Sequence, residues 1–514
     1  MGGTTMTTWQ SPHPVLEEQT IGDLQAAMES SQYTSRQLVE MYSERIAALN
    51  TNGPMLRAVI ELNPDALAIA EQLDHERAER GPRGPLHGIP ILLKDNIDTA
   101  DRMETTAGSL ALVGVKRAQD AHVAARLREA GAVLLGKTNM SEWANFRSTH
   151  SSSGWSARGG QALNPYALDR SPCGSSSGSA TAVAANLCAA SVGTETDGSI
   201  LCPASINGVV GIKPTVGLTS RHGVIPISHS QDTVGPFART VSDAAILLDA
   251  LAGADPRDPA TQASAGRIPA DYRQLLNADS LRGARIGIPR EIYTGYSEKV
   301  DAGFATVVET LKSLGAVLVD PANLPTAKQM RDSEAELTVL LYEFKADLNA
   351  YLTALGPEAQ AHTLEELITF NRDHAGQEMP YFGQELFEVA QQKGPLSEQE
   401  YLDARAECLR MARDEGIDAV MREHNLDALC MPTAEPAWMI DLIDGDHSMG
   451  GASQPAALAG YPAISVPAGH TFGLPIGVAF MGQAFSEATL IGYAYAFEQA
   501  TKARRAPTYP ELVA

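Results

Sequence analysis

The chain has 514 residues, of which 44% are hydrophobic and 20% are charged, the composition of a folded globular protein rather than a disordered or membrane-spanning one. Asp and Glu number 62 against 39 Lys and Arg, which leaves a formal net charge of −23. Because that charge repels a phosphate backbone, we expect no nucleic-acid partner.

The N-terminal region carries no sign of a targeting segment. The first 35 residues contain no Lys or Arg and no apolar stretch as long as the core of a signal peptide. No later stretch has the length and apolarity of a transmembrane helix. We therefore expect a cytoplasmic protein that does not bind a membrane, and the sequence leaves its oligomeric state open.

The cysteines are few, odd in number and without CxxC spacing; they are Cys173, Cys188, Cys202, Cys408 and Cys430. This pattern suggests neither a disulfide framework nor a zinc site. We expect each to be a small buried hydrophobic residue.

The N-terminal half has the periodicity of an α/β protein. Residues 34–50 begin at Thr34 and place apolar residues at helical spacing, which predicts an amphipathic helix among N-terminal helices covering about 20–50. Residues 88–98 (GIPILLKDNID) and 131–137 (GAVLLGK) are short apolar runs on either side of a helical stretch at 120–130. The predicted order is strand, helix, strand.

Polar loops rich in Ser and Gly follow. Residues 140–170 read as a long loop, and such loops are candidate site elements. Residues 171–179 (SPCGSSSGS) open onto a predicted helix at 180–190. A second loop at 193–203 (GTETDGSILCP) leads into 207–215 (NGVVGIKPT).

The C-terminal half returns to strands. Residues 284–289, 300–314 and 316–320 read as strand, helix, strand, for which parallel pairing is favoured. Residues 327–425 lack strand-like runs and predict a helical insertion that helps to enclose a pocket. Strand-like stretches at 428–431, 463–466 and 476–481 close the core. We predict a single large α/β domain over residues 1–514, in which a mixed twisted sheet is flanked by helices on both sides.

A literal G-x-S-x-G at 174–178 would make Ser176 the nucleophile of an α/β-hydrolase elbow. That motif requires a strand directly before the turn. The preceding residues 164–173 (NPYALDRSPC) contain two prolines and no apolar alternation, so the strand is missing. The elbow is the weaker interpretation.

The two Ser/Gly-rich loops, taken together, favour a different family from the α/β hydrolases. The stretch 172–215 resembles the signature of the amidase signature family, whose core pattern is PGGSSGGS, then GTDxGGSIRxP, then GLKPT. This chain has PCGSSSGS, GTETDGSILCP and GIKPT in the same order and spacing, with GIPILLKDN upstream. These motifs are highly specific, and the resemblance extends over most of the chain, with a signature core at about 85–255.

The resemblance implies that Ser199 is the nucleophile, Ser175 a bridging serine after a cis peptide bond from Gly174, and Lys94 the base. A lysine can act as a base only if it is held neutral, which burial without a counter-ion achieves. The resemblance also implies that an oxyanion is held by backbone N–H groups, those of Thr196, Asp197, Gly198 and Ser199. It implies no metal and no organic cofactor.

Other residues are rivals on sequence alone. Lys137 and Lys213 are alternative bases, although a solvated or ion-paired lysine is the ordinary interpretation of each. His150 and His222 are the histidines nearest to the motif loops, but neither sits in a recognisable triad pattern. Ser176 and its neighbour Ser177 are expected to shape the loop or cap the next helix.

The chain departs from the family pattern at Glu195, where Asp is usual, at Asp197, where Gly is usual, and at Leu201, where Arg is usual. Unless its side chain points away, Asp197 should oppose charge that develops on the oxyanion.

The loop GTETDGSI, with SPCGSSSGS and HAGQEMPYFGQE at 374–385, is similar to what peptide amidases of the family carry, which implies a small-molecule or peptide amide substrate. Ser151, Tyr381 and Phe382 are candidate substrate-binding residues. Aryl acylamides, carbamates and small aliphatic amides remain alternative substrates, as does a glutaminase-type role in an amidotransferase complex.

Overall fold

The computed structural model describes residue 9 and residues 11–513. Its strands form one large sheet and one small hairpin: β1 (Val59–Leu62), β2 (Pro90–Lys94), β3 (Val133–Thr138), β4 (Trp155–Ser156), β5 (Gly160–Gln161), β6 (Ala190–Glu195), β7 (Val210–Lys213), β8 (Thr233–Ala238), β9 (Arg285–Gly287), β10 (Val317–Val319), β11 (Ala428–Pro432), β12 (Ala463–Thr471) and β13 (Leu474–Met481).

The helices precede, separate and follow these strands. They are α1 (Ile21–Glu29), α2 (Ser35–Ile46), α3 (Ala66–Arg80), α4 (His122–Glu129), α5 (Ser177–Ala184), α6 (Leu201–Ile206), α7 (Val241–Leu251), α8 (Glu298–Ser313), α9 (Ala327–Asp332), α10 (Ala335–Thr353), α11 (Leu364–Asp373), α12 (Ala375–Glu378), α13 (Glu385–Gln391), α14 (Gln399–Leu409), α15 (Asp418–His424), α16 (Gln454–Ala459) and α17 (Glu487–Thr501). Short 3-10 or π-helical turns lie at Pro14–Leu16, Ala47–Thr51, Leu110–Leu112, Glu142–Asn145, Pro259–Ser264, Tyr272–Leu275 and Arg410–Ile417.

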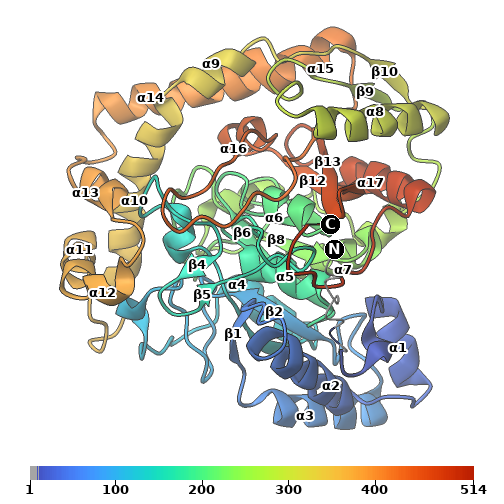
Figure 1. Cartoon of the computed structure of the whole chain (residues 1–514), viewed down its shortest axis with the longest axis vertical. Coiled ribbons are helices and arrows are strands. Elements are labelled where there is room, and N and C mark those ends of the chain that lie inside the picture. The colour runs from blue at the N-terminus through green and yellow to red at the C-terminus, as the bar shows by residue number, and fades with distance from the viewer. Residues whose placement is uncertain (1–8, 10, 514) are drawn as a thin grey trace, which may run out of the picture.

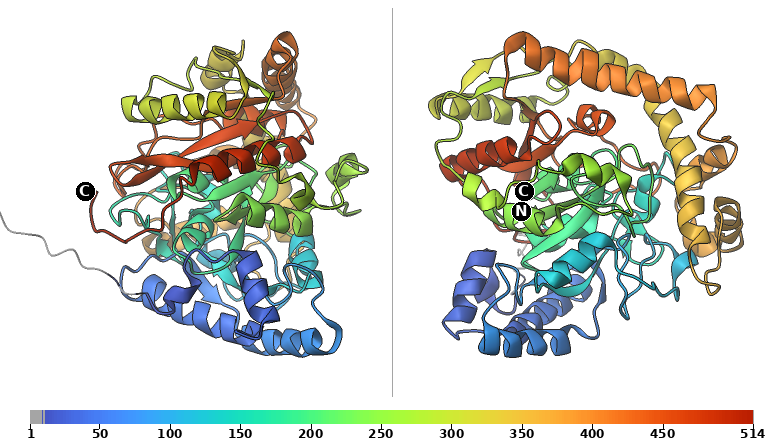
Figure 2. Two further views of the ribbon diagram at one scale, coloured as in Figure 1. Left: turned by 90° about the vertical axis from the view of Figure 1, so that its right-hand side faces the viewer. Right: turned by 180° about the vertical axis from the view of Figure 1, so that it is seen from behind.

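The large sheet has 11 strands in the order β1-β3-β2-β6-β8-β7-β12-β13-β11-β9-β10. β2 pairs in parallel with β3 and with β6, whereas β6 pairs antiparallel with β8, so the sheet is mixed as predicted. Helices lie on both faces of it (Figures 1 and 2). β2, β3, β6 and β8 are buried along their whole length, as expected of strands covered on both sides.

The pairing of β2 with β6 decides where the site forms. Because the two strands are parallel, their carboxyl ends reach the same edge of the sheet. Ligands of open α/β sheets bind outside such carboxyl ends. β2 ends at Lys94, and β6 leads into the loop that carries Ser199.

The amphipathic helix predicted at 34–50 is α2 with the π-helical turn that follows it. The hydroxyl of Thr34 accepts the backbone N–H of Gln37, and the Gln37 side chain accepts the N–H of Thr34. This reciprocal arrangement satisfies two N–H groups that a helix start leaves free. Leu38, Tyr42 and other apolar residues at the predicted spacing are buried.

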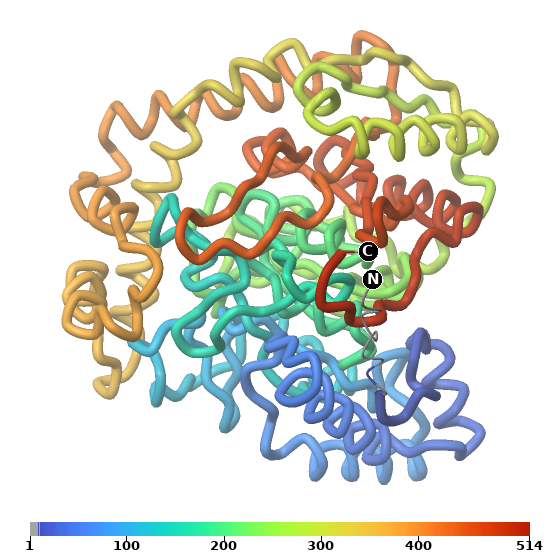
Figure 3. The backbone as a smooth tube through the Cα atoms, viewed as in Figure 1, coloured from blue at the N-terminus to red at the C-terminus, as the bar shows by residue number. Residues whose placement is uncertain are grey.

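The segment after β10 is helical, and α9 to α15 form an arch around the outside of the core (Figure 1). β9 and β10 pair in parallel, as the sequence predicts. Between β11 and α16 the chain makes a long excursion that passes across the front of the core (Figure 3). None of the helices between residues 11 and 513 has both the length and the apolarity needed to cross a bilayer.

Two boundaries differ from those that the sequence suggests. The helix predicted at 180–190 is α5, which ends at Ala184 because Asn186 has a left-handed φ of 56°. The loop predicted to begin at residue 193 begins later, because Gly193 to Glu195 pair with β8. Both segments are rich in small residues, so their hydrophobic periodicity is weak. Their structure depends instead on tertiary contacts.

Candidate active site

Lys94 is the last residue of β2, and its side chain is wholly buried. Its Nζ lies 2.8 Å from Ser175 Oγ, 2.8 Å from Thr194 Oγ1 and 3.3 Å from the carbonyl oxygen of Thr194. No carboxylate forms an ion pair with Lys94 within the described residues. Burial lowers the pKa of Lys94 from 10.5 to about 7, although the charges of Asp232 and Glu195 act against this shift.

Ser175 lies in the turn that enters α5, and the peptide bond between Gly174 and Ser175 is cis, as the resemblance implies. The turn is tightly packed. A Cβ added to Gly174 would lie 2.1 Å from Ser141 Oγ, so only glycine fits there. The backbone N–H of Ser141 donates to the carbonyl of Ser175 at 3.1 Å, which fixes the turn from the other side.

Ser199 follows β6 and immediately precedes α6. The backbone N–H groups of the predicted oxyanion site make no hydrogen bond with any described residue; they belong to Thr196, Asp197, Gly198 and Ser199. Gly198 has a φ of +77°, which turns this segment so that it departs from the strand. Four consecutive free donors form a suitable site for a developing oxyanion.

Glu195 holds the next part of the loop. Its carboxylate accepts the backbone N–H groups of Ile200 at 2.6 Å and Leu201 at 2.9 Å, the residue before α6 and the first residue of that helix. A carboxylate is favoured at a helix N-terminus. The residue that departs from the family pattern at 195 therefore shapes the loop rather than facing the substrate.

The structure brings the two serine loops together. The backbone N–H of Ser176 donates to the carbonyl of Ser199 at 3.3 Å. Within the described residues no hydrogen bond joins the hydroxyls of Ser175 and Ser199. Catalytic hydrogen bonds are often long in ligand-free enzymes and shorten when substrate binds.

Asp197 is accommodated by a second carboxyl group, that of Glu336 on α10. The side chains of Glu336 and Ser453 adjoin that of Asp197 and act against the rise in its pKa that burial causes. The amide groups of Gln231 and Gln454 donate to the two oxygens of Glu336 at 3.0 and 2.9 Å. Burial and the neighbouring Asp197 raise the pKa of Glu336 to about 8, so the two carboxyl groups share one proton at neutral pH.

Two further residues organise the site: Thr194, which belongs to the motif at 193–203, and Asp232, which belongs to none of the motifs. Thr194 Oγ1 receives hydrogen bonds from Lys94 and, at 3.0 Å, from Asn96. Asp232 accepts the Thr196 hydroxyl at 2.6 Å, and the backbone N–H groups of residues 227 and 228 bind its other oxygen. Only tertiary structure brings Asp232, which directly precedes β8, to the site, so this residue could not be found from motif spacing.

The rival bases lie elsewhere. Lys137 donates to the carbonyl of Ile97 and to Thr105 Oγ1 (2.9 Å), and Lys213 donates to the carbonyl of Tyr461 (2.7 Å). Both are wholly buried rather than solvated, and burial lowers the pKa of each to about 8. Neither contacts a serine of the motif loops, so Lys94 alone among the three lysines adjoins Ser175.

Ser176, the candidate nucleophile of an α/β-hydrolase elbow, has a structural role. Ser176 is fully buried, and its hydroxyl donates to the carbonyl of Thr194 at 2.9 Å and accepts that residue's N–H at 3.2 Å. It thereby attaches the turn to β6, but it does not cap α5. His150 is exposed and His222 is half-buried, and neither forms a hydrogen bond with a motif serine in the described part of the chain.

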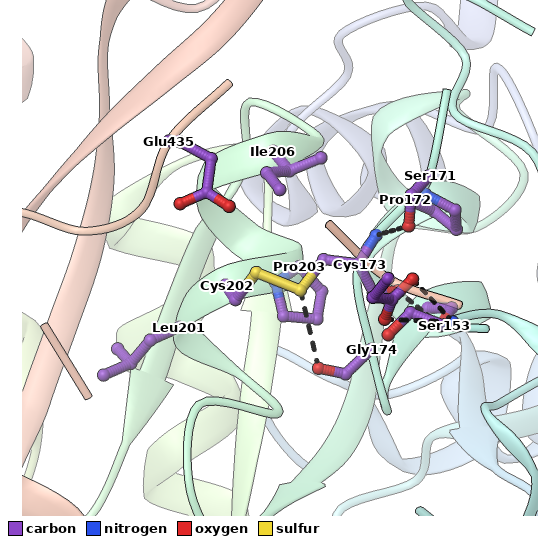
Figure 4. The surroundings of a disulfide bond; sticks show 12 residues. Ser153, Ser171, Pro172, Cys173, Gly174, Leu201, Cys202, Pro203, Ile206 and Glu435 are labelled. Carbon is purple, nitrogen blue, oxygen red and sulfur yellow. Dashed lines mark hydrogen bonds between the residues drawn. A yellow bond between two sulfur atoms is a disulfide. The ribbon is translucent and has the colours of Figure 1, made fainter. Parts of the chain in front are cut away.

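Two of the three candidate substrate-binding residues pack against a common aromatic residue, Trp155. The Ser151 hydroxyl donates to the carbonyl of Ser148 at 2.9 Å. Tyr381 is 45% exposed, whereas Phe382 is buried, and both rings meet the ring of Trp155 edge to face at 5.6 and 5.2 Å. Trp155 belongs to the segment whose Ser153 lies beside Gly174 (Figure 4).

Among the described residues, side chains that could bind a metal ion meet where His229, Glu343 and Asp347 bring ligand atoms within 4.8 Å of one another. Those atoms already have partners. His229 Nδ1 lies 2.8 Å from Asp347, and Glu343 accepts hydrogen bonds from three hydroxyls, those of Ser228, Ser230 and Tyr401. This group therefore secures a loop to α10.

The expectation that all cysteines are unpaired is wrong. Cys173 and Cys202 form a disulfide with Cα atoms 6.1 Å apart, while Cys188, Cys408 and Cys430 are free and buried (Figure 4). The two half-cystines are 29 residues apart and meet only because the two motif loops meet. Cysteine count and spacing hold no information about that contact.

Gly198 offers a test of the oxyanion loop. Alanine there would have to adopt a left-handed φ and would place its Cβ 3.0 Å from Ser453 Oγ. Alanine keeps the N–H of residue 198 but strains the backbone that aims it, so we expect Gly198→Ala to displace that donor and to lower kcat by about 10² to 10³-fold, the effect of losing one oxyanion donor. Gly283→Ala is the matched control, because Gly283 has a similar φ of +78° but nothing within 4 Å of its added Cβ. Equal losses in the two variants would contradict the oxyanion assignment.

A family model described as Amidase matches residues 37–491. The chain is 52% identical to the crystal structure of native peptide amidase from Stenotrophomonas maltophilia, with a TM-score of 0.92 and coverage of 97% of this chain and 100% of that one. It is 46% identical to an Arabidopsis thaliana protein named as a probable amidase, covering 96% of this chain and 92% of the relative. It is 36% identical to a glutamyl-tRNA(Gln) amidotransferase subunit from Chloroflexus aurantiacus, covering 95% and 97%. The chain belongs to the amidase family and is a hydrolase that acts on the carbon–nitrogen bonds of linear amides.

Proposed function

We propose that this amidase removes the amide group from the C-terminus of peptides, with Ser199 as nucleophile, Ser175 as proton relay and Lys94 as base. The observation that carries the mechanism is the contact between Ser175 Oγ and the buried Nζ of Lys94 at 2.8 Å. The similarity to a peptide amidase over nearly the whole chain supports the substrate class.

The contacts of Lys94 suit a neutral amine. A neutral amino group has two N–H donors and one lone pair. Once Lys94 is neutral, the hydroxyl and carbonyl oxygens of Thr194 can accept its two N–H groups, and its lone pair is then available to the Ser175 hydroxyl, to which the protonated amine donates. Ser175 can then donate its proton to Lys94 while it receives the proton of Ser199.

The reaction is an acyl transfer in two halves. Ser199 Oγ attacks the carboxamide carbon, and the oxyanion is held by the free N–H groups of residues 196–199. The proton taken up by Lys94 returns through Ser175 to the leaving nitrogen, so the C–N bond breaks and ammonia departs. Water then attacks the acyl-enzyme by the same relay and releases the peptide as a carboxylic acid.

Activity should depend on pH in both directions. The Lys94 pKa is lowered to about 7, so the base becomes neutral and kcat/KM rises as pH increases through that value. The pKa of Glu336 is raised to about 8, so above it a second negative charge appears beside the oxyanion donors and the rate falls. A pH-rate profile of wild type and Glu336→Gln checks this, because the variant should keep the rise and lose the fall.

A substrate panel tests the function. Wild-type protein is expected to release ammonia from a C-terminally amidated dipeptide and to leave its internal peptide bond intact. If it instead prefers an anilide, a carbamate or a small aliphatic amide, the peptide amidase proposal is wrong and the mechanism stands. The similarity to an amidotransferase component favours glutamine as a second candidate substrate, and ammonia release from glutamine only inside a complex would support that candidate.

A further inference from the structure

The Cys173–Cys202 disulfide joins the two loops that carry the serines of the proposed mechanism. Cys173 is two residues before Ser175, and Cys202 is three residues after Ser199, at the start of α6. Figure 4 shows the sulfur–sulfur bond passing directly between the two backbones. It is the one disulfide among the described residues, which include all five cysteines.

Hydrogen bonds between Ser176 and Thr194, at 2.9 and 3.2 Å, attach the turn to β6, but few hydrogen bonds reach the part of the second loop that carries Ser199. The backbone contact between Ser176 and Ser199 is long, at 3.3 Å, and no hydrogen bond joins the hydroxyls of Ser175 and Ser199 in the described part of the chain. Asn207 at the end of α6 donates to the carbonyl of Pro172 at 2.9 Å, farther from the serines. Ser175 is held by Lys94 on β2, and the segment after Ser199 is held by the Glu195 carboxylate, which accepts the N–H of Ile200.

We infer that the Cys173–Cys202 disulfide is a positioning element that sets the distance between Ser175 and Ser199, so that turnover depends on the redox state of these cysteines. This inference rests on the proposed relay. A displacement of about 1 Å in reacting groups can cost about 10²-fold in rate. The disulfide is two residues from Ser175 and three residues from Ser199. A covalent bond at these positions restricts the distance between the two hydroxyls more tightly than the 3.3 Å hydrogen bond between Ser176 and Ser199 does.

The chemistry of the switch is thiol–disulfide exchange. A dithiol attacks one sulfur as its thiolate, the S–S bond breaks, and the second thiol of the reagent displaces the protein thiol from the mixed disulfide. The protein gains two electrons and two protons, and the dithiol becomes a cyclic disulfide. Cys202 is partly exposed whereas Cys173 is buried, so Cys202 offers the accessible sulfur.

The experiment uses the full-length protein before and after reduction with dithiothreitol under native conditions. The thiol count after denaturation should increase from three to five. We expect kcat to fall by about 10 to 10²-fold, with KM changed far less and circular dichroism unchanged, and activity to return on reoxidation. The Cys173→Ser/Cys202→Ser variant should have the low kcat permanently and should not respond to dithiothreitol. Cys188→Ala, which removes a free buried cysteine, should respond like wild type.

Modification of Ser199 by phenylmethylsulfonyl fluoride supplies a readout that does not depend on the amide substrate. The rate of sulfonylation should fall on reduction to the same extent as kcat. If oxidised protein is not sulfonylated at Ser199, the proposed mechanism is wrong, and this conclusion does not depend on the role of the disulfide. If the fully reduced protein keeps kcat and the sulfonylation rate within about twofold, the positioning role is wrong. Loss of activity in step with loss of circular dichroism would also contradict it, because the disulfide would then only stabilise the fold.

Discussion

Replacing Ser199 by alanine is expected to reduce kcat for a peptide amide by about 10⁴ to 10⁶-fold, the loss found when a nucleophile that acts with its relay is removed. The substitution takes away the attacking oxygen but leaves the free N–H groups of the loop in place. KM should therefore change little. Ammonia release under saturating substrate measures the effect.

Ser176→Ala is the matched control for that variant. Ser176 is buried and bonds to Thr194, so its loss should weaken the attachment of the turn to β6 without removing a reacting group. We expect a decrease in kcat of about 10-fold or less, because the two lost hydrogen bonds are neutral and neither involves a reacting group. If Ser176→Ala were as inactive as Ser199→Ala, the α/β-hydrolase elbow would be the better interpretation.

Replacing Lys94 by methionine is expected to lower kcat by about 10³ to 10⁴-fold, in the upper range for general base catalysis. Methionine has a similar length and suits a wholly buried position, so the fold should persist. The proton of Ser175 then has no acceptor, because Nζ of Lys94 is the group that contacts its hydroxyl. The rise of the pH profile near 7 should disappear with the activity.

Lys137→Met controls for the removal of a buried lysine. Lys137 is as deeply buried as Lys94 and also has a lowered pKa, but it contacts Ile97 and Thr105 rather than a serine. We expect a loss of stability with kcat kept within about 10-fold. Thermal unfolding measured with kcat separates the two effects, and equal loss of kcat in both lysine variants would contradict the assignment of Lys94 as the base.

Much of the fold follows from local pattern. The apolar runs at 88–98 and 131–137 contain β2 and most of β3, and the helical stretch between them contains α4. These segments are predictable because a strand buried on both faces is a continuous apolar run, whereas an amphipathic helix repeats with a period near 3.6. The mixed sheet also follows, since the chain combines strand–helix–strand units with closely spaced C-terminal strands.

The parts that could not be predicted depend on pairing rather than on pattern. β8 has a Gly and a Pro in its sequence TVGPFA, residues that local preference assigns to loops. It is a strand because β6 and β7 pair with it on either side. The end of α5 similarly depends on the left-handed backbone at Asn186.

In the candidate site, too, some residues can be predicted from local sequence pattern and others depend on tertiary contacts. Lys94, Ser175 and Ser199 are identifiable because motif residues are constrained in type and spacing, and the structure places Lys94 against Ser175. Glu336 lies on a helix 139 residues after Asp197, and nothing in the sequence relates the two. The disulfide is unpredictable for the same reason, since two loops must fold together before their cysteines meet.

Identification of the acylated residue tests the central claim most directly. The protein is mixed with a p-nitrophenyl ester, quenched in acid during the first turnover, digested and mapped by mass spectrometry. The proposed mechanism predicts a single acyl group on Ser199, formed rapidly in wild type and very slowly in Lys94→Met. An acyl group on Ser176 or Ser175, or acylation of Ser199 at the wild-type rate in Lys94→Met, would contradict it.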